Sequence, residues 1–283
     1  MTKCNKFSIL INTTDSFEDC WVPFFTLFKK FWPSYNGKIY LNTETKVFTY
    51  SGLNIISLQN NIHTSAIRPT WSECLIRALD TIKDETILYM QEDYFLKDMV
   101  KNELVDKFAQ LMNDNREIHC VHLTDQSLIP DKKSEIFEGL YSVVKKQRYL
   151  VSCQAALWQK NILKSYLRPY ESAWEFEEFG SKRAGILNDN FYVVDHAWVK
   201  LNEFEIIPYV FTGIIQGRWF EETVPLFAKY QIKVDYTKRG FVKDAPTKPL
   251  LKKLEYRWKK IPIIIKHNLE LAKLKNKKLK KSS

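Results

Sequence analysis

The chain has 283 residues, of which 45% are hydrophobic and 27% are charged, so it can bury a large core. Glycine is scarce, and no G-x-G-x-x-G or Walker-type sequence occurs, which argues against folds that bind nucleotides through a glycine-rich loop. The five cysteines are scattered and form no C-x-x-C pair, a pattern typical of reduced thiols. The polar N-terminus has no apolar signal region, and we expect a cytoplasmic protein.

The net charge of +10 is concentrated at the C-terminus. Residues 248–283 hold thirteen Lys or Arg and two acidic residues, a net charge of +11, so residues 1–247 together carry −1. A nucleic-acid-binding protein more often carries its basic residues on the folded body. We therefore expect no nucleic-acid partner.

The hydrophobic pattern predicts alternating strands and helices as far as residue 125. In chain order we expect strands at 6–12, 38–42, 54–57, 87–90 and 118–123, with helices at 17–32, 65–83 and 101–113. Further on we expect a strand at 149–158, helices at 159–167, from 174 and at 219–230, and short strands within 205–213. The alternation predicts an α/β fold with a mostly parallel, Rossmann-like sheet flanked by helices.

Two adjacent acids, Glu92 and Asp93, end an apolar run that reads as a buried strand. Ligands in open α/β sheets collect beyond the carboxyl ends of the strands. Carboxylates there suit a hard divalent cation, Mn²⁺ or Mg²⁺, and the phosphates that it carries. The alternative is a strand that simply ends in a polar turn.

Thr13, Thr14 and Asp15 follow the first predicted strand and reach the same edge of the sheet. Small polar side chains at that edge can hydrogen-bond a base or a ribose. The alternative is an N-cap for the helix that follows, and both roles can hold together.

An acidic and aromatic segment, 174–183, offers a second site. A carboxylate such as Glu175 or Glu177 can accept a proton from an acceptor hydroxyl, and Lys182 and Arg183 can face phosphate. The alternative is a solvated helix face with i,i+4 ion pairs. Farther along, Arg218 beside two aromatic residues can clamp a diphosphate, although a loop before a helix explains it equally well.

Taken in order, these segments resemble bacterial glycosyltransferases of the GT-A fold that build capsule, O-antigen or related surface polysaccharides. The resemblance covers residues 6–240 and rests on QEDYF at 91–95, VSCQAALW at 151–158, WEFE at 174–177 and GSKR at 180–183. It implies a GT-A-like catalytic domain at 1–242, with a nucleotide-binding half (1–125) and an acceptor half (126–242). Residues 243–283 are then a linker and a basic tail.

The resemblance also implies roles for individual residues. The D-x-D-like position of the family falls on 91–93, where a glutamine replaces the first acid, so Asp93 is the expected metal ligand. The end of the first strand would contact the nucleotide of a UDP-sugar or a related donor. Glu177 would be the base of an inverting direct displacement, favoured over Glu175 by the W-x-x-E spacing. Arg183 or Arg218 would help to stabilise the leaving diphosphate.

The basic tail alternates apolar and cationic residues, a pattern that suits an anionic membrane surface. We expect two helices separated by Pro262, with the enzyme peripheral on the inner face of the cell membrane, beside a lipid-linked glycan acceptor. The alternatives are a solvated tail or a helix packed on the body.

Three other functions stay open from the sequence. The chain can be a non-catalytic carbohydrate-binding protein or a nucleic-acid-binding protein. It can also be a sugar nucleotidyltransferase, although the segment after the first strand is not the basic, glycine-rich loop of that class.

Overall fold

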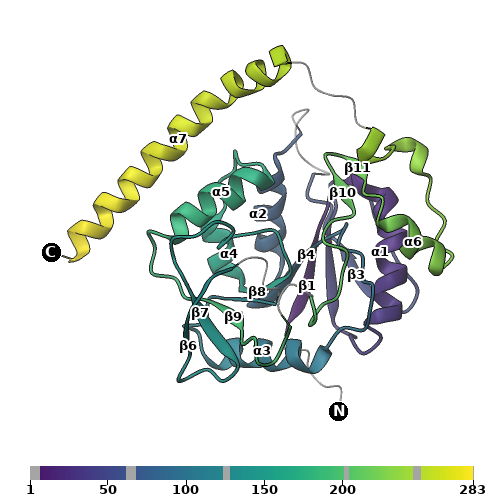
Figure 1. Cartoon of the computed structure of the whole chain (residues 1–283), viewed down its shortest axis with the longest axis horizontal. Helices are drawn as coiled ribbons and strands as arrows, with labels where there is room; N and C mark the ends of the chain where they lie inside the picture. The colour runs from purple at the N-terminus through teal and green to yellow at the C-terminus, as the bar shows by residue number, and fades with distance from the viewer. Residues whose placement is uncertain (1–6, 62–67, 124–127, 201–203, 245–249, 283) are drawn as a thin grey trace.

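A computed structural model describes residues 7–61, 68–123, 128–200, 204–244 and 250–282. Its centre is a nine-stranded sheet with the order β3-β2-β1-β4-β8-β5-β9-β7-β6, flanked by helices (Figure 1). Seven strands point in one direction, and β7 and β8 run opposite to them. The structure confirms the predicted mostly parallel, Rossmann-like sheet with flanking helices and a C-terminal helix.

The strands are β1 (Ser8–Asn12), β2 (Lys38–Asn42), β3 (Asn54–Ser57), β4 (Thr86–Gln91), β5 (Cys120–His122), β6 (Pro130–Lys133), β7 (Leu140–Val143), β8 (Ala156–Gln159), β9 (Phe191–Val194), β10 (Ile214–Ile215) and β11 (Arg218–Trp219). The α-helices are α1 (Glu18–Phe31), α2 (Trp71–Thr81), α3 (Asn102–Asp114), α4 (Lys160–Tyr166), α5 (Ala173–Ala184), α6 (Thr223–Lys229) and α7 (Leu250–Ser282). Three short 3₁₀ helices are η1 (Asp15–Phe17), η2 (Tyr236–Lys238) and η3 (Val242–Asp244).

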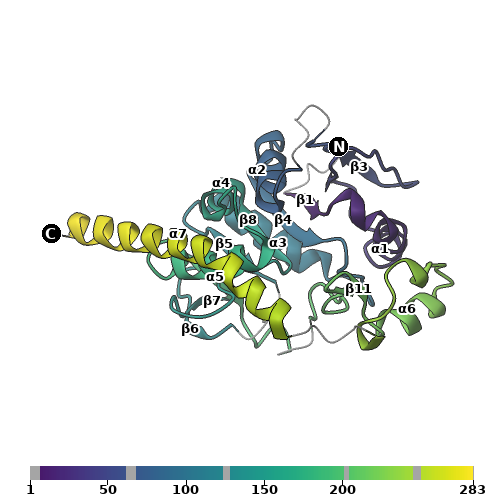
Figure 2. The same ribbon diagram turned by 90° about the horizontal axis from the view of Figure 1, so that it is seen from above.

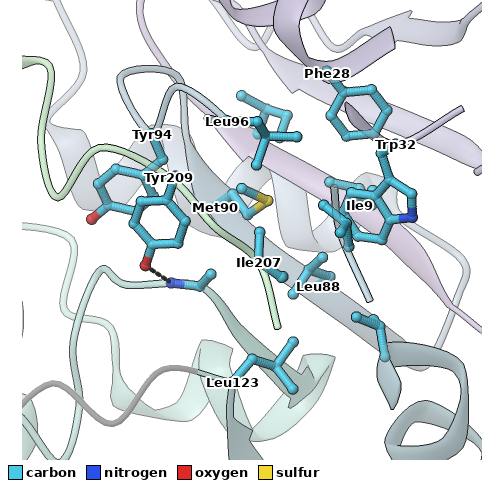
Figure 3. Close-up of a cluster of buried hydrophobic side chains, with 14 of the residues drawn as sticks. Ile9, Phe28, Trp32, Leu88, Met90, Tyr94, Leu96, Leu123, Ile207 and Tyr209 are labelled. Atoms are coloured by element: carbon cyan, nitrogen blue, oxygen red, sulfur yellow. Dashed lines mark hydrogen bonds between the residues drawn. The ribbon is translucent and has the colours of Figure 1, made fainter. Parts of the chain in front are cut away.

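Two hydrophobic cores lie on opposite faces of the sheet, because successive side chains of a strand point to opposite sides. Ile9 and Leu88 face the core covered by α1, α3 and α6. Leu10 and Ile87 face the core covered by α2, α4 and α5. Figure 3 shows the first core, where Phe28 of α1 lies over the strands. The continuous apolar runs of β1 and β4 are therefore buried on both faces.

The segment 205–213 is irregular, so the short strands predicted there are wrong. Ile206 and Ile207 are fully buried, which explains the apolar pattern. Pro208 lacks the N–H that a continuous ladder needs, and Tyr209 makes only an isolated bridge with Leu96. Figure 3 shows this segment crossing the core beside Tyr94 of the β4 end. The strand pair comes later, as β10 and β11.

Three other differences concern the second half of the chain. The strand predicted at 149–158 is confined to β8, Ala156–Gln159. The helix predicted at 219–230 begins only at Thr223, because Trp219 belongs to β11. Strands β6, β7 and β9 lie outside the predicted elements. The sequence of β6 is PDKK and its residues are largely exposed, so it shows no apolar period.

The C-terminal helix α7 runs unbroken through Pro262, so the predicted break is wrong. Proline inside a helix costs about 3 kcal/mol. Farther along the helix, Leu271 packs against the α5 side of the body and Glu270 pairs with Arg168, contacts that help to hold α7 in place. Figures 1 and 2 show α7 lying beside α5 and extending past the body. Among the described residues, no helix is both long and apolar enough to cross a bilayer.

Candidate functional site

Polar residues from three neighbouring parallel strands meet at one edge of the sheet. Asn12 at the end of β1 lies beside Asn42 of β2 and beside Gln91 of β4. The chain places β2 and β3 on one side of β1 and then returns to place β4 on the other side. Ligands of open α/β sheets bind beyond the strand ends at such a reversal. The acids that follow β4 therefore lie where the topology favours a ligand.

Asp93 is buried beyond β4 and holds a distant segment in place. Its Oδ2 accepts hydrogen bonds from the Thr212 hydroxyl at 2.8 Å and from the Ile214 N–H at 3.1 Å. This approach requires a glycine at 213, because a Cβ there would lie 2.2 Å from the Phe95 ring. Burial raises the pKa of Asp93, and the hydrogen bonds oppose that rise. Its other oxygen, Oδ1, is buried and has no hydrogen-bond partner among the described residues.

Glu92 lies beside Asp93 and is also buried. Burial raises the pKa of Glu92 well above its ordinary value, and the negative charge of Asp93 raises it further. Arg239 and the Thr13 hydroxyl act in the opposite direction. Two adjacent buried carboxyl groups repel each other when both are ionised, so a positive ligand at this edge would be bound favourably.

A divalent cation fits these residues only with help from a substrate. No group of three or more His, Cys, Asp or Glu side chains in the described part of the chain can hold a metal ion. Asp93 Oδ1 offers one unpaired carboxylate oxygen, and Glu92 is adjacent. Mg²⁺ commonly takes one or two carboxylates and completes its shell with water and substrate phosphates. The donor set fits a cation that a phosphate-bearing substrate brings with it.

Thr13 and Thr14 line the end of β1. The Thr13 hydroxyl is buried and accepts a hydrogen bond from Trp21 Nε1 at 2.9 Å. Thr14 stands at the N-cap position of η1, but its hydroxyl lies 2.7 Å from Ser16 Oγ and makes no capping hydrogen bond. Of the two hydroxyls, that of Thr13 also lowers the pKa of Glu92 by hydrogen bonding, so it is the one directed toward Glu92.

Asp15 organises the loop after β2. Its carboxylate accepts hydrogen bonds from the N–H groups of residues 44–46, at 2.8–3.2 Å, and from the Thr45 hydroxyl. Glu44, which the sequence reasoning missed, accepts in return from the Asp15 N–H at 3.1 Å and pairs with Arg68 through two hydrogen bonds. Asp15 thus positions the Glu44 loop, and both of its carboxylate oxygens already accept hydrogen bonds from the protein.

A row of three asparagines crosses the same edge and was also missed. Asn42 donates to Asn12 Oδ1 at 2.6 Å, and Asn60 donates to Asn42 Oδ1 at 2.5 Å. Asn12 and Asn42 end two of the predicted strands, so the reasoning applied to Thr13 would have found them. Side-chain amides both donate and accept, which suits recognition of a base or a sugar hydroxyl.

Glu177 is connected to the end of β4 through the Cys153 segment. Its Oε1 accepts a hydrogen bond from the Cys153 N–H at 2.8 Å. The Cys153 carbonyl accepts from the Tyr94 hydroxyl at 2.9 Å, which fastens this segment to the end of β4. The charges of Glu177 and of Asp93 both raise the pKa of the Cys153 thiol, after the larger effect of burial. Burial raises the pKa of Glu177, and the Cys153 N–H opposes that rise.

Glu175 and Lys182 have structural partners on α5. Glu175 Oε2 accepts from the Ser172 N–H and from the Ser172 hydroxyl, both at 2.8 Å, in a capping box. Lys182 donates to Glu178 at 2.6 Å and lies 4.4 Å from the centre of the Phe179 ring. These are the helix-surface contacts that the sequence left open as an alternative.

Arg183 is enclosed in the protein rather than placed at the sheet edge. Its side chain has no exposed surface, and it pairs with Glu171 at 2.6 Å. It also donates to the Tyr166 carbonyl at 2.7 Å, and Glu270 of α7 lies 3.4 Å away. The residue therefore links the α4–α5 region to α7 and leaves no surface for a phosphate.

Arg239, which no local sequence pattern singled out, supplies a cation whose charge acts on Glu92. It forms two hydrogen bonds with the Asp19 carboxylate, at 2.7 and 2.6 Å, and lies 4.4 Å from the Phe17 ring centre. Its charge lowers the pKa of Glu92. Arg218 of β11 lies next to it, with Nη1 3.4 Å from the Arg239 carbonyl. The predicted Arg218 thus borders a region in which Arg239 faces the acids.

No protein-family model and no curated protein sequence matches the chain. Several solved structures are similar to part of the chain. Glucosyl-3-phosphoglycerate synthase from Mycobacterium tuberculosis, crystallised with Mn²⁺, UDP-glucose and glycerol 3-phosphate, is 11% identical, with a TM-score of 0.42 and 73% of each chain covered. S. aureus TarS (residues 1–349) is 12% identical, with a TM-score of 0.38.

The matched region covers 67% of this chain and 58% of the TarS fragment, less than two thirds of that relative. It likewise covers 65% of a mycobacterial protein with a TM-score of 0.40 and 12% identity. A CMP:2-keto-3-deoxy-manno-octonic acid synthetase crystallised with CTP is also similar, at 10% identity and a TM-score of 0.33. These similarities concern the arrangement of strands and helices.

Proposed function

We propose that this chain is a glycosyltransferase that moves a sugar from a nucleotide-diphosphate sugar, with a UDP-sugar the favoured donor, to a hydroxyl group of a glycan acceptor. The observation that carries the proposal is the pair of buried acids at the reversal between β1 and β4, with Asp93 Oδ1 unpaired. Glu177 is the third carboxylate and acts on the same Cys153 segment as Asp93. In this proposal Asp93 and Glu92 serve the cation that accompanies the diphosphate, and Glu177 accepts the proton.

The donor is assigned to the edge formed by β1, β2 and β4. Asn12, Asn42 and Thr13 offer hydrogen bonds to the nucleoside. Asp93, assisted by Glu92, would hold a Mn²⁺ or Mg²⁺ ion, which would supply positive charge against the leaving diphosphate. The geometry assigns no such contact to Arg183, which is enclosed.

Glu177 is assigned the proton transfer. The acceptor hydroxyl oxygen forms a bond to the anomeric carbon of the donor while the bond from that carbon to the diphosphate oxygen breaks. The hydroxyl proton passes to the Glu177 carboxylate, and the electron pair of the broken bond leaves with the nucleotide diphosphate. Attack opposite the leaving group inverts the anomeric configuration. Glu175 is a weaker candidate, because its carboxylate caps α5.

The cellular setting follows from the basic C-terminal helix. We assign the chain to surface-polysaccharide synthesis of the capsule or O-antigen type, with a lipid-linked acceptor at the inner face of the cell membrane. Trp258, Ile261 and Ile265 of α7 are exposed apolar side chains on a helix rich in lysine, which suits an anionic bilayer surface. The proposal keeps the division into a catalytic domain at 1–242 and a linker and tail at 243–283.

A panel of nucleotide sugars with and without Mn²⁺, read by thermal shift and by donor hydrolysis, tests the proposal. We expect one donor class to stabilise the protein, and stabilisation to fall with a chelator. Glu177→Gln should bind the donor as the wild type does and lose transfer, whereas Glu103→Gln, at an exposed glutamate of α3 outside the site, should keep it. Binding of no nucleotide sugar would overturn the proposal. Release of pyrophosphate from a nucleoside triphosphate and a sugar phosphate would instead identify a nucleotidyltransferase.

A further inference from the structure

A cavity of about 710 Å³ lies on the outer side of α5. Its walls are the loop 146–149, one face of α5 and the facing side of α7. Glu177 is part of the wall, whereas Glu92 and Asp93 are not. Since Glu177 also bonds the Cys153 segment beside the β4 acids, it is the residue common to both regions.

The wall that α7 provides is fixed to the body. Leu271 packs with Phe179 and Ile186 in a small buried cluster. His267 stacks on the Phe179 ring with 3.7 Å between ring centres, and Lys278 donates to the Ile186 carbonyl at 2.7 Å. The cavity is therefore a feature of the folded chain and includes its C-terminal helix.

The charge of this cavity favours an anion. Lys146, Arg148 and Lys275 line it, are exposed, and form no ion pair among the residues that the structure describes. The other lining cation, Lys182, already pairs with Glu178. Against these three cations, Glu177 is the lining carboxylate without an ion pair in the described part of the chain, so the net charge of the concave surface is positive and attracts an anion. The fork of an arginine suits the paired oxygens of a phosphate in particular.

Two exposed aromatic rings give the same cavity a second property. Trp174 is 67% exposed and Tyr149 is 49% exposed, which is unusual for large rings that share one hollow. Tyr149 also has a φ of 59°, in the left-handed region that costs a non-glycine residue free energy. Flat apolar rings at the wall of a polar hollow can cover the C–H face of a sugar ring.

We propose that this cavity is the acceptor site and that it binds a sugar that carries a phosphate. The inference rests on the proposed function for the role of Glu177, and it adds the chemical class of the acceptor. The aromatic rings hold the sugar, the unpaired cations hold its phosphate, and Glu177 faces a sugar hydroxyl. Because α7 forms part of the wall, the C-terminal helix takes part in acceptor binding.

Calorimetric titration of the full chain with glucose 1-phosphate, glucose and inorganic phosphate tests the site without requiring catalysis. We expect glucose 1-phosphate to bind at least about tenfold more tightly than either fragment. Arg148→Ala and Lys275→Ala should each weaken it about tenfold, as expected for the loss of a charge-assisted hydrogen bond. Lys273→Ala, an exposed lysine on α7 outside the cavity wall, is the matched control and should leave binding unchanged.

Trp174→Ala should weaken glucose 1-phosphate and leave inorganic phosphate unaffected. Dodecyl glucosyl phosphate, tested in place of glucose 1-phosphate, distinguishes a lipid-linked acceptor from a free sugar phosphate. Only a lipid-linked acceptor predicts that the dodecyl compound binds more tightly than glucose 1-phosphate. Equal binding by the Arg148, Lys275 and Lys273 variants would overturn the proposal. Loss of nucleotide-diphosphate binding in Arg148→Ala would also overturn it, by making the cavity the donor site. If the protein binds glucose 1-phosphate but no nucleotide sugar, the glycosyltransferase proposal is wrong, and the cavity is still a sugar-phosphate site.

Discussion

At the residue scale, the two oxygens of the Asp93 carboxylate have different surroundings. One accepts hydrogen bonds from the Thr212 hydroxyl and the Ile214 N–H, and the other is buried without a partner among the described residues. A purely structural aspartate has no use for the second oxygen, whereas a cation ligand requires it. Asp93 therefore combines attachment of the segment 212–214 with the proposed contact to a cation.

Replacing Asp93 with alanine should affect stability as well as activity. The change leaves the Thr212 hydroxyl and the Ile214 N–H without their acceptor, and unpaired buried groups cost about 1–3 kcal/mol. We expect the free energy of unfolding to fall by that amount in Asp93→Ala and by less in Asp93→Asn, which keeps an acceptor oxygen. Urea unfolding measures both. Equal stability of Asp93→Ala and wild type would contradict the structural half of this assignment.

Glu177 should make stability depend on pH in a defined direction. Burial raises its pKa above the ordinary value of 4.5, so the folded protein holds the Glu177 proton more tightly than the unfolded chain does. Its contribution to stability is therefore full below that ordinary value and is lost as the pH rises through the raised one. Glutamine cannot ionise and can still accept the Cys153 N–H, so Glu177→Gln should be more stable than wild type at about pH 7.

Thermal unfolding measured between about pH 5 and pH 8 should show that stability gap closing as the pH falls. Glu178→Gln is the control, because Glu178 is exposed and pairs with Lys182. The same burial predicts that transfer declines on the acid side at a pH above 4.5, where Glu177 takes up its proton. A gap that widens toward low pH would be incompatible with a raised pKa.

At the element scale, α5 separates two neighbouring cations that the sequence presents alike. Lys182 points to solvent and pairs with Glu178, whereas Arg183 lies on the enclosed side and pairs with Glu171. A single charged segment at 180–183 is consistent with a phosphate clamp, and only the tertiary packing of α4 and α7 decides which residue is enclosed. The helix itself was predictable, but the orientation of Arg183 was not.

Removing the partner of Arg183 should be costly. Glu171→Gln removes the nearer, fully buried counter-charge of Arg183 and leaves only Glu270, 3.4 Å away; breaking a comparable buried pair costs about 3–5 kcal/mol, the upper bound for this change. Lys182→Ala breaks a solvent-exposed i,i+4 pair worth about 0.3–0.5 kcal/mol. We expect guanidinium chloride unfolding to show this contrast. A loss of similar size in both variants would mean that Arg183 is not held by Glu171 in solution.

The strands and helices that the sequence predicted well are those with a clear period and a buried face. Strands β2 and β3 have the predicted bounds, because they carry an apolar pattern between turn residues. The strands predicted within 205–213 were wrong for the opposite reason. Ile206 and Ile207 are buried there, but the segment forms no continuous ladder of strand hydrogen bonds. At the site, Glu92 and Asp93 stood at a visible strand end. Arg239 reaches them from more than a hundred residues away, and only tertiary structure reveals it.

At the scale of the whole molecule, α7 has two faces with different tasks. His267 and Leu271 are buried against the body, and Glu270 pairs with Arg168. Trp258 and Ile265 are exposed on the same helix, at 71% and 53%. One helix thus joins the cavity wall to an outward apolar surface. If that surface contacts a bilayer, the acceptor cavity lies beside the membrane.

A single substitution on the exposed face should therefore separate membrane binding from folding. Deleting residues 249–283 would also remove Glu270 and His267 from the interior contacts, so it tests two properties at once. Ile265→Glu removes one apolar side chain, whose burial in lipid is worth about 1.5–3 kcal/mol, and adds a negative charge facing anionic headgroups. We expect it to lower binding to phosphatidylglycerol vesicles at least about tenfold in a flotation assay, with an unchanged unfolding temperature.

The matched control is Asn268→Glu, which adds the same charge at an exposed polar position of α7. It should reduce vesicle binding only by the electrostatic part, about 1 kcal/mol per charge near an anionic surface. Raising the salt concentration should narrow the difference between wild type and Asn268→Glu, because the Debye length shortens. The part of the binding loss in Ile265→Glu that comes from the missing apolar side chain should persist at high salt. If both variants bind as the wild type does, α7 is not the membrane contact, and its exposed isoleucines serve another partner.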